Sequence, residues 1–235
     1  MIDFKIAAFS DTHNQHKLVK LPDPDYIDIL VFAGDATSRG SLEETIKFVK
    51  WFGSLPHKHK ILVPGNHDWL FEKDPGLTKK ICDDAGVTLL NDSGVTIEGI
   101  KFWGSPVTPW FMDWAFNRAR NENESILRRV PLISEHWDKI PNDTEVLITH
   151  GPAYEKLDEL KMPNGEPYPL PRHAGCKDLK NAIERVKPDI HICGHIHSGH
   201  GEIHKNGTSY YNVAILDDMY CAVNQPKIIE MYKEK

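Results

Sequence analysis

Five short apolar runs recur along this sequence, and each leads into glycine, Asp, Asn or His. The runs are FKIAAFS (4–10), DILVFAG (28–34), KILVPG (60–65), VLITHG (146–151) and DIHICG (189–194). Each has the length of a strand and is apolar almost throughout, which is typical of strands buried on both faces of a sheet. The chain is therefore expected to be an α/β protein built around buried, mostly parallel strands.

Polar side chains follow all five runs, at the points where the predicted strands end. They are Asp11 and His13, then Asp35, then Asn66, His67 and Asp68, then His150, and finally His195 and His197. In open α/β sheets, ligands bind at the carboxyl ends of the strands. If the strands are mostly parallel, all five groups of side chains converge on one edge.

The side chains at this edge suit two divalent cations. Imidazole binds zinc, iron, nickel and manganese, whereas carboxylate and amide oxygens favour manganese and harder ions. Two such cations need a shared anion between them, and Asp35 can supply one oxygen to each. A bridging hydroxide would complete the pair. Two dications, two carboxylates and one hydroxide leave a formal charge of about +1, which attracts a phosphate ester.

Helical patterns and later strands complete the expected organisation. The segment 41–52 opens with Ser41 and has Glu44 three residues later, the signature of a capping box. The segment 176–188 is amphipathic and ends before Pro188. Residues 95–105, 208–216 and 226–232 are expected to be antiparallel strands joined by glycine turns. Residues 105–140 and 152–175 fit this scheme poorly, and long loops of this kind are often functional.

Composition narrows the class of protein and of partner. The chain has 235 residues, 40% of them hydrophobic, a formal net charge of −6 and four scattered cysteines. This length and content fit one domain, residues 1–235, with a sizeable core. The charge and the absence of a basic block argue against a nucleic-acid partner. No run approaches the ~20 apolar residues of a membrane span, and a cytoplasmic protein is expected. The sequence indicates no oligomeric state.

In their order along the chain, these motifs resemble those of the calcineurin-like metallophosphoesterase superfamily. The series DxH, GD, GNHD, THG and GHIH spans residues 11–197. The resemblance implies a four-layer α/β/β/α sandwich with two central mixed sheets. It also implies that Asp11, His13, Asp35 and His197 hold one metal ion, and that Asp35, Asn66, His150 and His195 hold the other. Manganese is favoured over iron, zinc or nickel.

The same resemblance gives His67 and Asp68 catalytic rather than metal-binding roles. His67 would lie over the substrate phosphate as an acid or electrostatic group, with Asp68 orienting or charging it. The segments 103–118, 174–176 and 194–201 look like those of the MPPED-type group of metallophosphoesterase-domain proteins, which is linked to cyclic-nucleotide phosphodiesters. The expected reaction is hydrolysis of a small phosphodiester by metal-bound hydroxide. The alternatives are a phosphomonoesterase and a metal-bound scaffold protein with little catalysis.

Several residues near the motifs allow two interpretations. Asn66 is a candidate to contact substrate as well as metal, and His200, which follows the last motif, is another candidate to contact substrate. Arg118 is a candidate phosphate ligand or the partner in a structural ion pair. Trp110, Trp114 and Phe116 are expected to pack a hydrophobic segment, and the alternative is that one of these aromatic residues lines a base or aryl pocket. His191 alternates with Ile190 and Ile192 and is expected to face away from the site, with a structural role.

Overall fold

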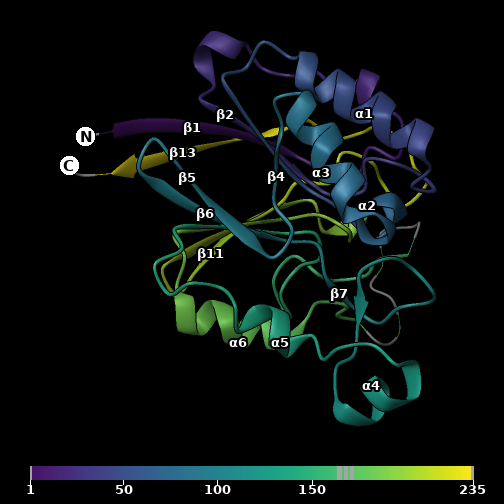
Figure 1. The fold of residues 1–235 in the computed structure, drawn as a ribbon. Helices are drawn as coiled ribbons and strands as arrows, with labels where there is room; N and C mark the ends of the chain where they lie inside the picture. Colours follow the sequence, from purple (N-terminus) through teal and green to yellow (C-terminus); the bar gives the residue numbers. More distant parts are fainter. Residues whose placement is uncertain (1, 163–165, 167–168, 170–171, 234–235) are drawn as a thin grey trace.

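The computed structural model describes residues 2–162, 166, 169 and 172–233. Its strands form two large sheets that pack face to face, and helices cover the outer face of each sheet (Figure 1). The layers in Figure 1 run from α1 and α3 through the first and second sheets to α5 and α6. This order confirms the four-layer α/β/β/α sandwich that the resemblance implies.

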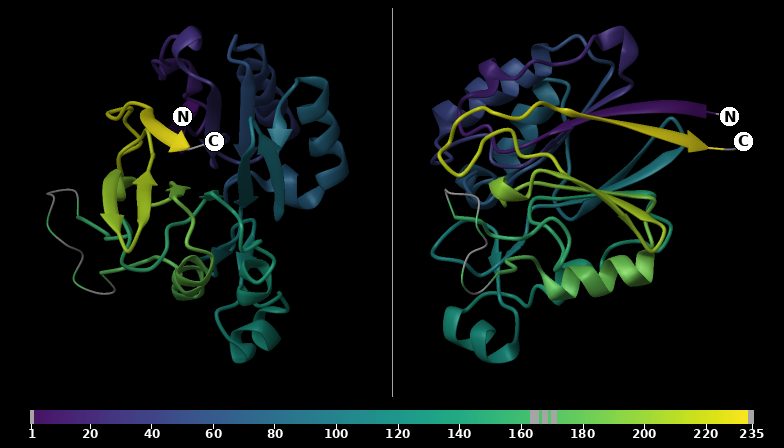
Figure 2. Two further views of the ribbon diagram at one scale, coloured as in Figure 1. Left: turned by 90° about the vertical axis from the view of Figure 1, so that its left-hand side faces the viewer. Right: turned by 180° about the vertical axis from the view of Figure 1, so that it is seen from behind.

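The first sheet has the strand order β13-β1-β2-β3-β4. Its strands are β1 (Ile2–Phe9), β2 (Ile29–Ala33), β3 (His59–Val63), β4 (Thr88–Leu89) and β13 (Lys227–Lys233). The first four run parallel, and β13 pairs antiparallel with β1. This pairing sets Ile2 opposite Lys233, so the two ends of the chain lie side by side (Figure 2).

The second sheet has the order β11-β12-β10-β9-β6-β5. Its strands are β5 (Ser93–Ile97), β6 (Ile100–Ser105), β9 (Val146–Thr149), β10 (Ile190–Cys193), β11 (Gly201–Lys205) and β12 (Thr208–Asn212). The five predicted runs are thus β1, β2 and β3 of one sheet and β9 and β10 of the other. The expectation for 208–216 was partly wrong, because β12 ends at Asn212 and pairs parallel with β10 as well as antiparallel with β11.

The main core lies between the two sheets and follows the two-residue period of the strands. Along β1, Phe4, Ile6 and Ala8 face the second sheet, whereas Ala7 and Phe9 face the outer helices. Both sets are buried, which explains why the run is apolar at nearly every position.

Helices connect the strands and cover the sheets. They are α1 (Leu42–Ser54), α2 (Trp69–Lys73), α3 (Pro75–Asp84), α4 (Glu122–Arg128), α5 (Ser134–Trp137) and α6 (Lys177–Val186). The capping box of α1 is confirmed, since Glu44 N donates to Ser41 Oγ and Ser41 N donates to Glu44 Oε2. None of the helices in the described part of the chain is long and apolar enough to cross a membrane.

Short elements occupy the first of the two segments that fit the sequence scheme poorly, and the described residues of the second form no helix or strand. Residues 105–140 contain β7 (Thr108–Pro109), β8 (Asn117–Arg118), α4 and α5. Figure 1 shows α4 hanging below the four layers. In the second segment, 152–175, residues 163–165, 167–168 and 170–171 lie outside the described residues. The 3₁₀ turns are η1 (His16–Leu18), η2 (Pro24–Tyr26) and η3 (His197–Gly199).

A single buried carboxylate, that of Asp68, joins the loops that follow β2 and β3. Its Oδ2 accepts hydrogen bonds from the backbone amides of Asp35 (3.0 Å), Ala36 (3.2 Å) and Gly65 (2.8 Å). Its Oδ1 accepts from the amide (3.0 Å) and the hydroxyl (2.7 Å) of Thr37. Burial and the nearby Asp35 carboxylate raise the pKa of Asp68 to about 6, although these donors oppose the shift. Asp68 therefore fixes where the two loops lie relative to each other.

We expect Asp68→Asn to lower the free energy of unfolding by about 3 kcal/mol, because an amide NH₂ would face backbone donors in place of a carboxylate oxygen. Urea denaturation of the metal-free protein measures the effect. Asp218→Asn, at an exposed aspartate, serves as the control and should leave the midpoint unchanged. Equal midpoints for wild type and Asp68→Asn would contradict the role assigned to Asp68.

Candidate metal centre

The carboxyl ends of β1, β2, β3, β9 and β10 bring eight side chains together at one edge of the two sheets. This donor cluster consists of Asp11, His13, Asp35, Asn66, His67, His150, His195 and His197. Ligand atoms within 4.8 Å of one another define three overlapping groups, namely Asp11 with His13 and His197, His13 with Asp35 and His67, and Asp35 with His150 and His195. Asn66 joins them through Oδ1, which lies 2.8 Å from His150 Nε2. The sequence prediction that these residues converge is therefore confirmed.

Asp35 lies where the groups overlap. Its Oδ2 is 3.6 Å from His13 Nε2 and 3.3 Å from His150 Nε2, while its Oδ1 accepts a hydrogen bond from the His67 amide at 2.8 Å. Two ligand atoms bound to one ion at about 2.1 Å lie roughly 3.0–3.4 Å apart, close to these separations. Oδ2 of Asp35 thus faces both His13 and His150, which belong to different groups, whereas the sequence argument assigned one Asp35 oxygen to each metal ion.

The burial of the cluster indicates that a cation belongs there. Asp11 and Asp35 are 0% and 2% exposed, and His150 is 0% exposed. Both ring nitrogens of His13 are buried and have no hydrogen-bond partner among the described residues. Such orphaned polar atoms are rare in folded proteins and call for an explanation. A set of imidazole, carboxylate and amide donors fits a divalent metal ion, so the residues present fit the implied cofactor.

Backbone carbonyls hold three of the imidazole rings in place. The Nδ1 atoms of His150 and His197 lie 2.9 Å from the carbonyl oxygens of Ala33 and Asp217. These bonds leave each Nε2 directed at the carboxylates, the arrangement usual for metal-binding histidines. The Nδ1 of His67 likewise lies 2.9 Å from the Ser38 carbonyl.

The electrostatics keep the carboxylates ionised. Burial raises the pKa of Asp35, but the charge and hydrogen bond of His150 outweigh it and hold that pKa well below the usual range. Burial lowers the pKa of His150, but Asp35 more than offsets this and brings it to about 9. Burial and the neighbouring His150 lower the pKa of His195 to about 4. Cation binding at neutral pH would therefore release a proton from His150.

Four residues of the donor cluster have a left-handed backbone conformation, which residues other than glycine rarely adopt. The φ angles are 54° at Asp11, 39° at His13, 59° at Asp35 and 68° at His195. This conformation costs of the order of 1 kcal/mol at each position, and such strain concentrates at functional sites.

Two glycines allow the strand ends to approach the carboxylates. A Cβ atom on Gly65 would overlap Asp35 Oδ1, and one on Gly194 would overlap Asp11 Oδ2. This close approach explains why glycine precedes Asn66 and His195 in the two motifs.

A cavity of about 340 Å³ opens above the donor cluster. We call it the metal cavity, and it is lined by His13, Asp35, Asn66, His67, Phe111, Met112, Trp114, His195, His197, Asp218 and Tyr220. Aromatic and imidazole rings form one wall of the metal cavity. The Trp114 ring stacks on the His67 ring with centroids 4.0 Å apart, and the centroid of the Tyr220 ring lies 4.9 Å from that of the His13 ring. For Trp114, the structure thus supports the aromatic-pocket interpretation.

Sequence reasoning missed Asp218 and Tyr220. A signal for them was present, since the apolar residues 213–216 lead into Asp217 and Asp218 much as the other five runs lead into their polar residues. It also missed Phe111 and Met112, which are exposed side chains of the loop between β7 and β8.

Two predicted substrate contacts lie outside the lining of the metal cavity. Arg118 pairs with Glu72 at 2.9 Å, and its Nε lies 3.0 Å from His136, so the structure shows the ion-pair alternative. His200 follows η3, and its side chain is half-buried, with a buried Nδ1 that has no hydrogen-bond partner among the described residues. Contact of either residue with substrate stays a prediction.

The expected contact between Asp68 and His67 is corrected by the structure. The described hydrogen bonds of the Asp68 carboxylate go to backbone amides and to Thr37, and the Ser38 carbonyl faces the His67 ring instead. Asp68 is buried beneath the loops, where its carboxylate accepts hydrogen bonds from backbone amides and makes none with the His67 ring.

As predicted, His191 is structural, since it is buried and its Nε2 lies 2.8 Å from Thr149 Oγ1.

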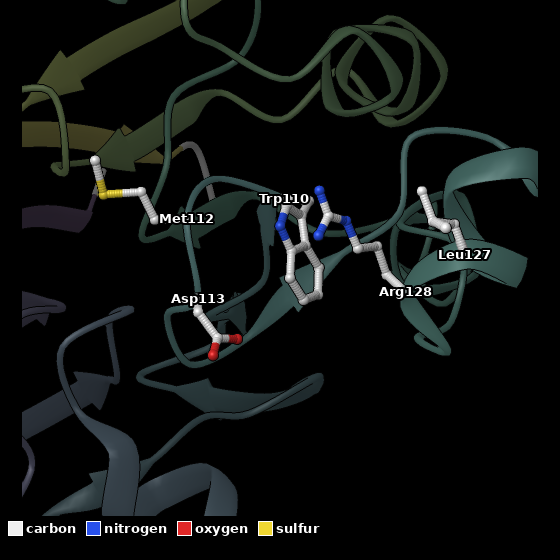
Figure 3. A pocket seen from close by; sticks show the side chains of 5 residues that line it. All are labelled: Trp110, Met112, Asp113, Leu127 and Arg128. Carbon is white, nitrogen blue, oxygen red and sulfur yellow. The ribbon is translucent and has the colours of Figure 1, made fainter.

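A separate hollow lies beside the metal cavity, toward α4. Trp110, Met112, Asp113, Leu127 and Arg128 line it (Figure 3). The Arg128 guanidinium lies 5.0 Å from the centre of the Trp110 ring, so this tryptophan packs on an arginine and does not face the donor cluster.

Comparison with known proteins agrees with this geometry. A model of the calcineurin-like phosphoesterase family matches residues 4–199. The chain is 32% identical to human metallophosphoesterase domain-containing protein 1, over 97% of this chain and 71% of that protein. It is 37% identical to the UPF0046 protein K07C11.7 of Caenorhabditis elegans, over 89% of this chain and 69% of that protein.

A solved structure shares the fold at low sequence identity. The crystal structure of TT1561 of Thermus thermophilus superposes with a TM-score of 0.56 at 12% identity, covering 90% of this chain and 89% of that one. Together, the family match and the two relatives establish that the chain belongs to the calcineurin-like phosphoesterases.

Proposed function

We propose that this protein is a phosphodiesterase that hydrolyses small, monoanionic phosphodiesters with the help of two divalent ions, manganese being favoured. One ion would be held by Asp11, His13, Asp35 and His197, and the other by Asp35, Asn66, His150 and His195. The family match supports a metal-dependent phosphoesterase. The overlap of two donor groups at Asp35 supports two ions rather than one.

The charge of the metal cavity is the observation that favours a diester. Among the described residues that line it there is no Lys or Arg, and Asp218 adds a carboxylate at the rim. A phosphate monoester is a dianion near neutral pH, and its second charge would have no protein cation to pair with. A diester carries one charge and has no such requirement.

The residues of the chain can then be given roles in hydrolysis. When bound, divalent ions lower the pKa of water and polarise phosphate oxygens. His67 lines the cavity, and its Nδ1 is held by the Ser38 carbonyl, so Nε2 is free to donate a proton to the leaving oxygen. Stacking on Trp114 fixes the plane of the His67 ring. Asp68 acts at a distance, by setting the loop on which His67 lies.

The test is an assay of bis-p-nitrophenyl phosphate against p-nitrophenyl phosphate with added Mn²⁺. We expect kcat/KM for the diester to exceed that for the monoester by about tenfold or more.

Asp218→Asn should raise the activity on the monoester relative to the diester, because it removes a negative charge that repels the dianion. The expected rise is only about threefold, since an exposed charge is partly screened. Asp113→Asn, which makes the same change in charge outside the metal cavity, is the control.

The possible outcomes of this assay separate the candidate functions. Preference for the monoester would identify a phosphomonoesterase. No hydrolysis of either ester by metal-loaded protein would identify a scaffold protein. An equal effect of Asp218→Asn and Asp113→Asn would contradict the charge argument.

Asp35→Asn should reduce bound metal from two ions per chain to one or fewer, because the amide loses the negative charge shared by both groups. Elemental analysis of protein dialysed against Mn²⁺ measures the ratio, with Asp113→Asn as the control. Two ions per chain in Asp35→Asn would rule out the bridging assignment.

His67→Ala should slow hydrolysis of diesters with alkyl leaving groups by roughly 10²-fold or more, because these depend on protonation of the leaving oxygen. Hydrolysis with p-nitrophenolate as the leaving group should fall much less. His204→Ala, at an exposed histidine on β11, is the control. Equal losses for both kinds of leaving group would contradict an acid role for His67.

A further inference from the structure

We infer that a second cavity, adjoining the metal cavity, binds the organic group that stays on phosphorus after hydrolysis, and that this group is aryl-sized and largely apolar with one hydrogen-bonding edge. The inference rests on the proposed function, because it assigns a substrate class to the same site. It adds a specificity pocket and a recognition residue, His173.

The second cavity has a volume of about 650 Å³, nearly twice that of the metal cavity. The described residues that line it are Pro109, Phe111, Arg120, Tyr154, Leu160, His173, Ala174, Gly175, Cys176, Lys177, Asp178, His195 and Ile196. Phe111 and His195 line both cavities, so the two cavities adjoin each other. A predominantly apolar hollow with a few polar groups is typical of a small-molecule site.

The Arg and the Lys side chain that line the second cavity already have partners. Arg120 Nη1 donates to the Trp110 carbonyl at 2.7 Å and also pairs with Glu124. The Lys177 ammonium lies over the Tyr154 ring, 5.1 Å from its centre. Among the other polar side chains of the lining, His173 is the one whose ring is held by a buried carboxylate.

A buried carboxylate fixes the orientation of His173. The Nδ1 of this ring lies 2.8 Å from Asp158 Oδ1, and Asp158 is 1% exposed. Asp158 Oδ2 in turn accepts from the amides of Glu155 and Gly175, both at 3.0 Å. Because Nδ1 is held by the carboxylate, Nε2 is the ring atom left for recognition, and it has no hydrogen-bond partner among the described residues.

The arrangement of the donor cluster indicates which part of the substrate reaches the second cavity. His67, the candidate acid, groups with His13 and Asp35, whereas His195 groups with Asp35 and His150. The leaving oxygen must lie near His67 to receive its proton. The other ester group is then directed toward His195, which forms part of the wall of the second cavity.

The test uses three monoanionic diesters that share p-nitrophenolate as the leaving group and retain a methyl, phenyl or 3-hydroxyphenyl group. Wild type with Mn²⁺ should prefer phenyl over methyl by about tenfold in kcat/KM, and 3-hydroxyphenyl over phenyl by a further severalfold. The variants are Ala174→Phe, which fills the cavity, and His173→Ala, which removes the polar contact.

Each variant has a distinct expected signature. Ala174→Phe should reduce the kcat/KM of both aryl esters to the level of the methyl ester. His173→Ala should abolish only the advantage of the hydroxyl group, seen as a rise in KM. His204→Ala, the exposed control, should change none of the ratios.

Failure of this inference is distinguishable from failure of the proposed function. Hydrolysis of all three diesters at equal kcat/KM, or equal losses for all three in Ala174→Phe, would overturn the second cavity as a subsite and leave the diesterase standing. If the protein hydrolyses none of the three diesters, calorimetric titration with diphenyl phosphate and with dimethyl phosphate tests the subsite through binding alone. Tighter binding of diphenyl phosphate that Ala174→Phe removes supports the subsite, and equal affinities would overturn it.

Discussion

The packing of two buried carboxylates, Asp11 and Asp35, among imidazole rings is the interaction on which the rest of the structure depends. Burying a carboxylate is strongly unfavourable unless it gains compensating charge and hydrogen bonds. The backbone supplies part of this compensation, since the His195 amide donates to Asp11 and the His67 amide donates to Asp35. The remainder comes from the histidines, which are also the side chains that make the edge suitable for a cation.

The donor cluster lies across the junction of the two sheets. Strands β1, β2 and β3 of the first sheet supply one set of donors, and β9 and β10 of the second sheet supply the other. An ion held by Asp11 and His197 would therefore link the two sheets directly. Since the unfolded chain offers no such site, metal binding would stabilise the folded state as well as serve the reaction.

Much of this arrangement could be predicted from the sequence because it depends on local pattern. The apolar runs identify β1, β2, β3, β9 and β10, and the order of Asp, Asn and His after them identifies the donor cluster. The capping box at Ser41 is likewise visible over four residues. Each of these features needs only short stretches of chain and the rule that parallel strands share an edge.

Other features arise only from contacts between distant segments. Asp68 follows His67 directly, but its partners belong largely to the loop after β2, so its scaffold role depends on how two loops meet. The sequence left open whether Arg118 contacts phosphate or forms an ion pair, because only the fold brings Glu72 and His136 beside it. The second cavity combines residues from 109–120, 154–160, 173–178 and 195–196, which no single run of sequence brings together.

The antiparallel pairing of β1 with β13 has a practical consequence. Both ends of the chain lie at the amino end of β1, whereas the metal cavity lies past its carboxyl end. A strand of this length spans roughly 25 Å. A fusion partner or a surface tether attached at either terminus would therefore leave the cavity mouth open to solvent, which makes the domain suited to immobilisation.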